Sequence, residues 1–242
     1  MKGKLLYFFI FFLIMAGTAY ASLLDLNIAY CSKYIWRGYD LNAGQPAVQP
    51  GATVYLGNTG LSLGLWASCN AGDPYASTTA GGIVNREVTE IDYTATYASF
   101  IGDDWNYSVY YSYYTYPVAP EGRTGELFLS LTGNNLPLTP TMIASYDHDK
   151  GKGAYLSLSG KRSFPAGSLP VDVSLAVGYD CGQFGVKAGP SDATATVSSV
   201  ISTGNMNLTP SFNYTIVNHE SRPLDGNLFW FALAAASKNT NM

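Results

Sequence analysis

The sequence has no long apolar run beyond its first residues, and it has few charges. No later stretch approaches the roughly 18 consecutive apolar residues expected of a transmembrane helix, which excludes helical membrane spans. Asp, Glu, Lys and Arg make up 12% of the 242 residues, and the formal net charge is −4 at pH 7. Because the chain has neither a basic tail nor an Arg/Lys-rich helix, we exclude a nucleic-acid partner.

The residue types that commonly carry catalysis or bind metals are also rare. The two histidines, His148 and His219, fall in expected loops and have no strand serine at a spacing suited to a lipid-cleaving site, so we expect no enzymatic activity. Asp147 and Asp149 beside His148, or Glu220 beside His219, would supply two or three metal ligands in loops, and solvated charge explains them more simply. No phosphate loop, dinucleotide motif or zinc spacing occurs, so we expect no cofactor and no metal.

Three cysteines, Cys31, Cys69 and Cys181, form no metal or redox motif. Their odd number allows one disulfide at most. A pairing of Cys69 with Cys181 through loops is one possibility, and three free thiols are the simpler interpretation.

The first residues predict export. Lys2 and Lys4 precede an apolar run over 5–16, and Ala19-Tyr20-Ala21 then gives the small-x-small pattern that signal peptidases cleave. The run is shorter than the roughly 20 residues of a helical span, which disfavours a retained anchor. No cysteine follows the cleavage site, which excludes a lipoprotein. We therefore predict a signal peptide over 1–21 and a mature domain over 22–242.

What is abundant points to strands and turns, with 19 Tyr, 25 Gly and much Ser and Thr. Alternation of apolar and polar residues predicts an all-β chain of about twelve strands, an even number that suits a single-chain bacterial barrel. The expected limits are 24–36, 45–57, 60–70, 87–99, 104–116, 124–133, 138–147, 152–162, 170–180, 193–203, 206–217 and 226–236. Pro210 implies a bulge or a strand start inside the eleventh of these.

Alternation alone would also fit a soluble β-sandwich, so the lengths of the connections decide between the two folds. Short turns such as 57–60 and 102–104 alternate with long connections such as 70–87 and 181–193, and 163–169 is an exception to the pattern. This predicts a transmembrane antiparallel β-barrel with short periplasmic turns, long outer loops and every second side chain facing lipid.

Several segments resemble a known family. The segments SKYIWRGYDLNAGQPAVQPG over 32–51 and GLSLGLWASCN over 60–70 carry the likeness, above all in the Trp-Arg-Gly and PAVQ elements. By these, and by weaker matches through 153–160, the chain resembles the TorF-type porins, formerly a conserved family of unknown function. The resemblance implies an outer-membrane barrel and no known substrate. The chain departs from the usual barrel pattern at its end, where Phe229-Trp230-Phe231 is followed by AAASKNTNM rather than by a terminal aromatic residue for the assembly machinery.

We expect seven charged side chains to face the lumen. They are Lys33 and Arg37 on the first strand, Glu90 and Asp92 on the fourth, Glu126 on the sixth, Lys161 on the eighth and Asp172 on the ninth. They would either orient passing dipoles or pair to brace the wall.

The expected function is passive passage of small polar solutes through a porin or narrow channel in the bacterial outer membrane. The expected partners are outer-membrane lipid, small hydrophilic solutes and the barrel-assembly machinery. The alternative is a plugged structural or adhesive barrel that acts through its outer loops, and a lipid-modifying enzyme comes third.

Overall fold

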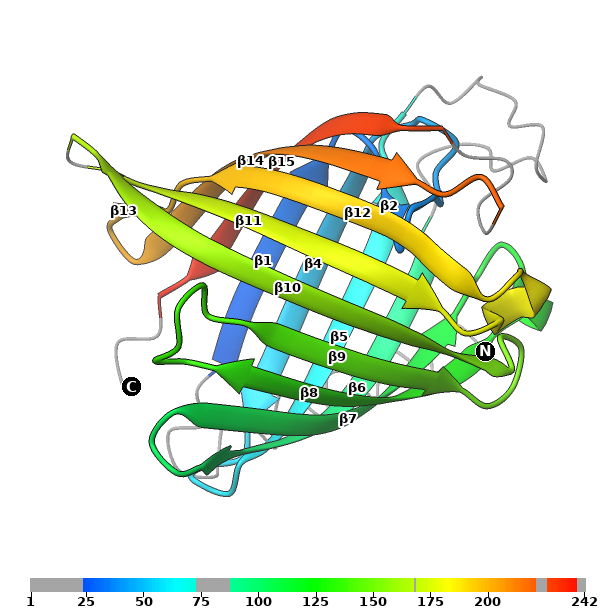
Figure 1. Ribbon diagram of the computed structural model, residues 1–242, viewed down its shortest axis with the longest axis horizontal. Coiled ribbons are helices and arrows are strands. Elements are labelled where there is room, and N and C mark those ends of the chain that lie inside the picture. The colour runs from blue at the N-terminus through cyan, green and yellow to red at the C-terminus, as the bar shows by residue number, and fades with distance from the viewer. Residues whose placement is uncertain (1–23, 73–87, 168, 221–225, 239–242) are drawn as a thin grey trace, which may run out of the picture.

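Twelve long antiparallel strands form one sheet that closes on itself (Figure 1). The computed structural model describes residues 24–72, 88–167, 169–220 and 226–238, so the predicted signal peptide lies outside the described residues. The strands of the ring are β1 (Leu24–Cys31), β4 (Ala47–Tyr55), β5 (Leu61–Asn70), β6 (Val88–Ile101), β7 (Trp105–Thr115), β8 (Thr124–Gly133), β9 (Thr141–Asp147), β10 (Gly153–Ala166), β11 (Leu169–Asp180), β12 (Gly189–Ser198), β14 (Met206–Val217) and β15 (Leu228–Ser237). The predicted twelve-stranded barrel is confirmed.

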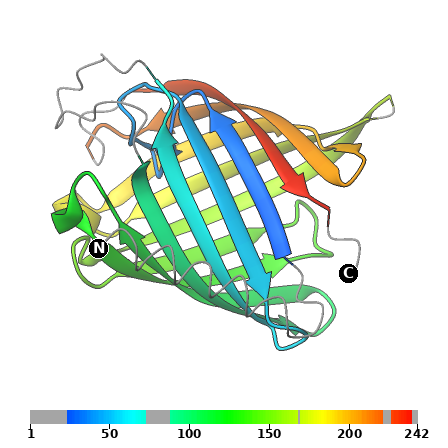
Figure 2. The same ribbon diagram turned by 180° about the vertical axis from the view of Figure 1, so that it is seen from behind.

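The ring closes between the first and last strands. β1 pairs with β4 on one side and with β15 on the other, where Asn27 lies opposite Ala236 (Figure 2). The alanines that follow Phe231 therefore belong to β15 and continue the ladder, although the strand does not end on an aromatic residue. No helix in the described part of the chain is both long enough and apolar enough to cross a membrane.

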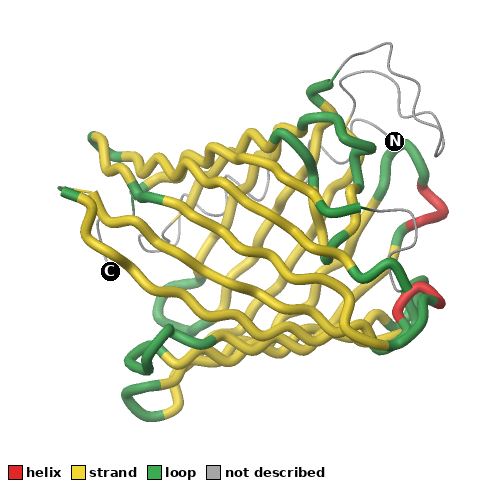
Figure 3. The backbone as a smooth tube through the Cα atoms, turned by 45° about the horizontal axis from the view of Figure 1, so that its top comes forward, coloured by secondary structure: helices red, strands yellow, loops and turns green. Residues whose placement is uncertain are grey.

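The two ends of the barrel differ in their connections (Figure 3). One end, called here the turn end, carries short turns in which Gly57, Gly102 and Gly167 have positive φ. The other, called here the loop end, carries longer connections, including the 3₁₀ turns η1 (Pro120–Gly122) and η2 (Gln183–Gly185). The prediction of a long connection over 163–169 was wrong, because β10 and β11 stay paired as far as Ala166 and Leu169. The connection 134–140 at the same end is longer than expected, because β9 begins only at Thr141.

Side chains alternate between an apolar outer wall and a polar inner face, as a strand period of two requires. On β8 the outward Leu127 and Leu129 are more than half exposed, while the inward Glu126 and Phe128 are buried. The same alternation runs around the ring, where β1 presents Leu26 and Ile28, and β11 presents Val173, Leu175 and Val177. The wall therefore has the pattern of a barrel that meets hydrocarbon outside and polar contents inside.

Pro210 interrupts pairing without the expected bulge. β12 pairs with β14 up to Ser198 and Ser211, and the short β13 (Ile201–Thr203) resumes the same register at Ile201 and Leu208. Between them Ser199 N donates to Pro210 O, but proline has no N–H to donate in return. The gap in the ladder is the consequence, and the prediction of a bulge or a strand start was wrong.

All three cysteines are free thiols. Cys31 is buried at the end of β1, Cys69 lies on β5, and Cys181 is exposed just after β11. The structure therefore contains no Cys69–Cys181 bridge.

Candidate functional site in the barrel lumen

The connection between β1 and β4 folds into the lumen. We name residues 32–46 the lumenal hairpin, in which β2 (Ile35–Trp36) pairs with β3 (Tyr39–Asp40). Arg37 and Gly38 form its two-residue turn with φ of 49° and 80°, and positive φ at both central residues is typical of a type I′ turn. The first strand was expected to run to residue 36 and was therefore predicted too long. Lys33 and Arg37 belong to the hairpin and not to the barrel wall.

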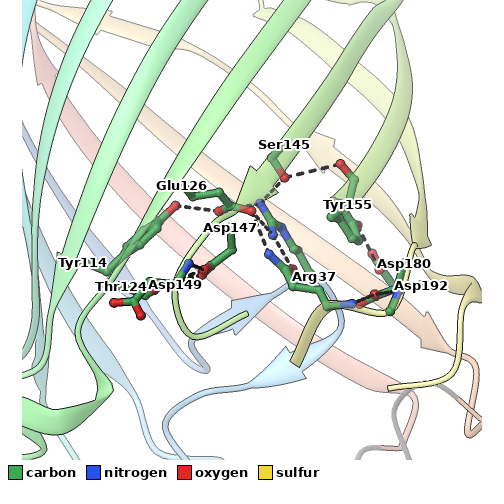
Figure 4. Close-up of polar contacts among 12 residues, drawn as sticks. Arg37, Tyr114, Thr124, Glu126, Ser145, Asp147, Asp149, Tyr155, Asp180 and Asp192 are labelled. Carbon is green, nitrogen blue, oxygen red and sulfur yellow. Dashed lines mark hydrogen bonds and ion pairs between the residues drawn. The ribbon is translucent and has the colours of Figure 1, made fainter. Parts of the chain in front are cut away.

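The Arg37 guanidinium donates four hydrogen bonds to the opposite wall and to the β11–β12 loop (Figure 4). Its guanidinium donates to both carboxylate oxygens of Glu126, at 2.7 and 3.0 Å, in the bidentate geometry that favours arginine. It also donates to Gln183 Oε1 at 2.7 Å and to Ser145 Oγ at 3.0 Å. The Arg37 and Glu126 side chains are 8% and 1% exposed. This is a buried ion pair, and it matches the bracing interpretation of the lumenal charges.

Aromatic rings enclose the Arg37 guanidinium. Its central carbon lies 4.3 Å from the Trp36 ring centroid and 4.4 Å from that of Tyr155 on β10. A desolvated guanidinium between two ring faces gains cation–π attraction in addition to its ion pair. The hairpin tip is therefore held by an ion pair, by hydrogen bonds and by contacts with aromatic rings.

The residues that bind Arg37 are themselves held by further hydrogen bonds. Tyr114 donates to Glu126 Oε2 at 3.1 Å, and Gln183 Nε2 donates to Glu126 Oε1 at 2.9 Å. Gln183 is 1% exposed and is positioned by Asp180, whose Oδ1 accepts its backbone N–H at 2.6 Å. Hairpin, barrel wall and the β11–β12 loop therefore form one connected network at the loop end.

Gly38 shows how closely the tip approaches the wall. A Cβ at this position would lie 2.9 Å from Asp192 Cβ and 3.1 Å from Val217 Cγ1, on β12 and β14. Its φ of 80° also favours glycine. The Trp-Arg-Gly element thus supplies a ring against the guanidinium, the guanidinium itself and the only residue type that fits the contact.

The expected acidic residues of β6 face inward as well. Glu90 is 5% exposed and accepts a hydrogen bond from Tyr34 of the hairpin at 3.0 Å. Tyr116, just beyond β7, lies near the same carboxylate. Burial and then the Glu90 carboxylate raise the pKa values of both tyrosines above their ordinary range, so their hydroxyls stay protonated and act as donors. Asp92 is the next inward residue of β6.

The remaining expected residues lie elsewhere. Lys161 Nζ is 3.4 Å from Asp172 Oδ2 on the neighbouring strand, near the turn end. The Lys161 side chain is 52% exposed, so this pair contributes little stability. Lys33 lies at the base of the hairpin, where its Nζ and Asp40 Oδ2 are both close to Gly44. None of these three residues touches the Arg37 network in the contacts described.

Sequence reasoning missed most partners of Arg37. Gln183, Ser145 and Tyr155 were not expected at the site, nor were Asp147, Asp180 and Asp192, which are inward residues at or near strand ends. Asp147 accepts hydrogen bonds from Thr124 Oγ1 and from the Asp149 backbone, which explains this aspartate without a metal. An aspartate that closes a strand at an inward position is a signal that could have found some of them.

His148 lies on the outer surface and not in the lumen. Its ring stacks on Tyr111 with centroids 5.8 Å apart, and its Nε2 lies 3.0 Å from the Tyr111 hydroxyl. The contact joins a loop residue to the outer wall of β7.

The lumen is roomy towards the turn end. A cavity of about 250 Å³ is lined by Trp66 and by small inward residues, namely Asn27, Gly51, Thr53, Ser62, Gly64, Thr94 and Thr96, together with Ala52 and Leu65. A Cβ on Gly64 would meet nothing nearer than 3.7 Å, so space remains beside it. Small hydroxyl side chains at inward positions leave this part of the barrel unfilled.

Charge in the loop-end half of the lumen is mostly negative. The barrel wall at this end carries six inward or buried carboxylates, whereas the hairpin brings Arg37 and Lys33; the carboxylates are Glu90, Asp92, Glu126, Asp147, Asp180 and Asp192. The sequence predicted lumenal charges of both signs, and the structure adds Asp147, Asp180 and Asp192 to the acidic set. Such an excess favours cations over anions inside the barrel.

Comparisons with known proteins agree with this fold. A family model described as "Bacterial protein of unknown function (Gcw_chp)" matches residues 16–189. The structure is similar to the KdgM porin, with a TM-score of 0.53 and 8% identity over 89% of this chain and 99% of that chain. It is similar to the NanC porin, with a TM-score of 0.51 and 10% identity over 90% and 100% of the chains. It is also similar to an outer membrane channel from Pseudomonas putida F1, with a TM-score of 0.50 and 11% identity over 89% and 95%.

At these identities the likeness establishes the fold, which is the closed barrel of outer-membrane porins. No curated protein matches the chain. The TorF-type name stays a prediction.

Proposed function

This chain belongs to the Gcw_chp family of bacterial proteins of unknown function, and we propose that it is an outer-membrane channel for small polar solutes. The lumenal hairpin narrows the loop end, and the half of the lumen towards the turn end forms the vestibule. The proposal includes export, assembly into the outer membrane by the barrel-assembly machinery and no enzymatic activity.

One observation carries the proposal: the inward positions beyond the hairpin are small and polar. β6 presents Thr94 and Thr96, β10 presents Ser157 and Ser159, and β12 presents Thr194, Thr196 and Ser198 to the interior. A barrel with a purely structural role gains stability when its interior is filled by large side chains. A lumen lined by small hydroxyl groups instead supports the passage of hydrated solutes.

A second candidate is favoured by the hairpin itself. A plug held by a buried ion pair suits a barrel that acts through its outer loops and transports nothing. The two candidates differ in conductance. Purified mature protein in planar bilayers should give small, measurable currents if the channel proposal is right, and none if the hairpin is a permanent plug.

Ion selectivity gives a further expectation. Because carboxylates outnumber Arg37 around the narrow part of the lumen, the channel should prefer cations. In a KCl gradient the reversal potential should therefore have the sign of the K⁺ equilibrium potential. Asp92→Asn should weaken this preference, and high salt should weaken it too, since the Debye length falls from about 10 Å at 0.1 M to about 3 Å at 1 M. A preference for Cl⁻ in the unmodified protein would contradict the proposed path past these carboxylates.

The proposed orientation places the loop end outside the cell. Cys181 is exposed at this end, whereas Cys31 is buried at the end of β1. A membrane-impermeant maleimide added to intact Gram-negative cells should therefore label the protein, and Cys181→Ser should abolish the labelling. Labelling that needs permeabilised cells would overturn the orientation.

A further inference from the structure

Three buried polar atoms on neighbouring strands have no hydrogen-bond partner among the described residues. They are Gln49 Nε2 on β4, Ser68 Oγ on β5 and Asp92 Oδ1 on β6. Gln49 is 8% exposed and Ser68 1% exposed. Because buried polar groups in native proteins are nearly always paired, a cluster of three unpaired ones points to a bound molecule.

The strand register brings the three atoms to one place. The pairs Val48–Cys69 and Gly51–Trp66 flank Gln49 and place it opposite Ser68. On the other side of β5, Ser68 pairs with Glu90 and Trp66 pairs with Asp92. All are inward positions, so they form a continuous polar patch on the lumenal face, between the hairpin and the cavity.

The patch carries two carboxyl groups that have no basic partner among the described residues. The ion pairs of the described residues involve Glu126, Asp172 and Glu220, and neither Glu90 nor Asp92. The hydrogen bond that Glu90 accepts comes from the Tyr34 hydroxyl, which brings no positive charge. Two neighbouring carboxylates, of which Glu90 is buried and Asp92 is half-buried, therefore favour a cationic occupant.

The surroundings favour an organic cation over a metal ion. The rings of Tyr34 and Trp66 lie beside the patch, with centroids 5.7 Å apart, and aromatic faces attract ammonium groups. Ca²⁺ takes about six to eight oxygen ligands, more than two carboxylates and one hydroxyl supply. Gln49 Nε2 is a donor and needs an acceptor, which a hydroxyl oxygen on the same molecule would provide.

We propose that this patch binds a small hydroxyl-bearing amine, with its ammonium group at Asp92 and Glu90 and its hydroxyl towards Gln49 and Ser68. The adjoining cavity of about 250 Å³, which Trp66 also lines, admits a molecule of a few heavy atoms. This assignment rests on the proposed function, since it names a class of solute that enters the lumen from the turn end.

Equilibrium binding tests the assignment without requiring conductance. Mature protein folded in detergent is titrated calorimetrically with ethanolamine, with ethylammonium, which lacks the hydroxyl, with ethylene glycol, which lacks the charge, and with calcium chloride. Ethanolamine should bind most tightly, ethylammonium several-fold more weakly, and ethylene glycol not measurably. Binding of calcium without ethanolamine would replace the organic cation by a metal ion, and absence of binding by every probe would overturn the site.

Variants locate the binding. Asp92→Asn should weaken ethanolamine binding by about tenfold or more, since it removes a charge-assisted hydrogen bond. Gly64→Val should also weaken it by occupying the adjoining space. Asp172→Asn makes the same chemical change in the lumen near the turn end and should leave the affinity unchanged. Equal affinity of Asp92→Asn and the unmodified protein would overturn the site.

Circular dichroism and heat-dependent gel mobility confirm that each variant is a folded barrel. Conductance with no ethanolamine binding would refute this inference alone. Binding with no conductance would refute only the proposed channel.

Discussion

Replacing Arg37 with alanine is expected to lower the free energy of unfolding by about 3 to 5 kcal/mol, because Glu126 would be left buried without its counter-charge. The value should fall towards the lower end of this range, since Tyr114 and Gln183 still donate to Glu126 in the variant. The same change should raise the mean conductance in planar bilayers, because the hairpin tip loses its bonds to β8, to β9 and to the β11–β12 loop. Urea unfolding in detergent and single-channel recording measure the two effects.

Two matched variants separate the possible causes. Arg37→Asn keeps a residue type that tolerates the positive φ of the turn, so it removes the side-chain contacts without adding backbone strain. Arg123→Ala removes an exposed arginine at the same end of the barrel and should change the stability by less than about 0.5 kcal/mol. If Arg37→Asn were as stable and as poorly conducting as the unmodified protein, the ion pair would not be what holds the hairpin.

Replacing Leu129 with arginine is the second large expected effect. Leu129 lies near the middle of β8, faces outward and is 53% exposed. If that face meets hydrocarbon, the charge should cost about 2 to 4 kcal/mol of stability in lipid vesicles. On a water-facing surface the same substitution would cost almost nothing.

The neighbouring position supplies the control. Ser130 pairs with Ile143 and points into the lumen, so Ser130→Arg introduces the same side chain one residue away on the polar face. We expect it to change conductance and selectivity more than stability. Equal stability of Leu129→Arg and Ser130→Arg in vesicles would contradict a lipid-facing outer wall.

The sequence predicted the wall of the barrel well for a physical reason. Alternation has a period of two and is visible within any single strand, so β6, β8, β11 and β14 could each be recognised from local residues. Short turns were equally local, because residues such as Gly57 and Gly102 adopt positive φ in them. Strand number and inward faces follow from these two signals alone.

The lumenal hairpin could not be predicted in the same way. Tyr34 and Trp36 continue the alternation of β1, and an arginine is an unusual residue for a positive φ. The left-handed conformation of Arg37 costs of order 1 to 3 kcal/mol, and it is retained here because the surroundings fix the side chain so firmly. Those surroundings lie far away in the sequence: Arg37 and Gln183 are 146 positions apart, and Arg37 and Ser145 are 108.

The proposed binding patch on β4–β6 shows a further limit of prediction from the sequence. Glu90 and Asp92 were expected in the lumen from their alternation, but that they lack a basic partner depends on where Arg37 goes. Because the hairpin places Arg37 on Glu126, the β6 carboxylates are left without a basic partner among the described residues. The charge pattern of the lumen is therefore a property of the closed barrel and not of any one strand.

Single-channel conductance of a protein without the hairpin tests the central claim most directly. Tyr34 and Leu41 are already joined by a backbone hydrogen bond of 2.9 Å, so residues 35–40 can be replaced by an Asn-Gly turn without opening the loop. If the hairpin narrows a solute path, the shortened protein should form stable channels with a conductance several-fold above that of the unmodified protein. An intact barrel whose conductance is unchanged or absent after the replacement would contradict the account.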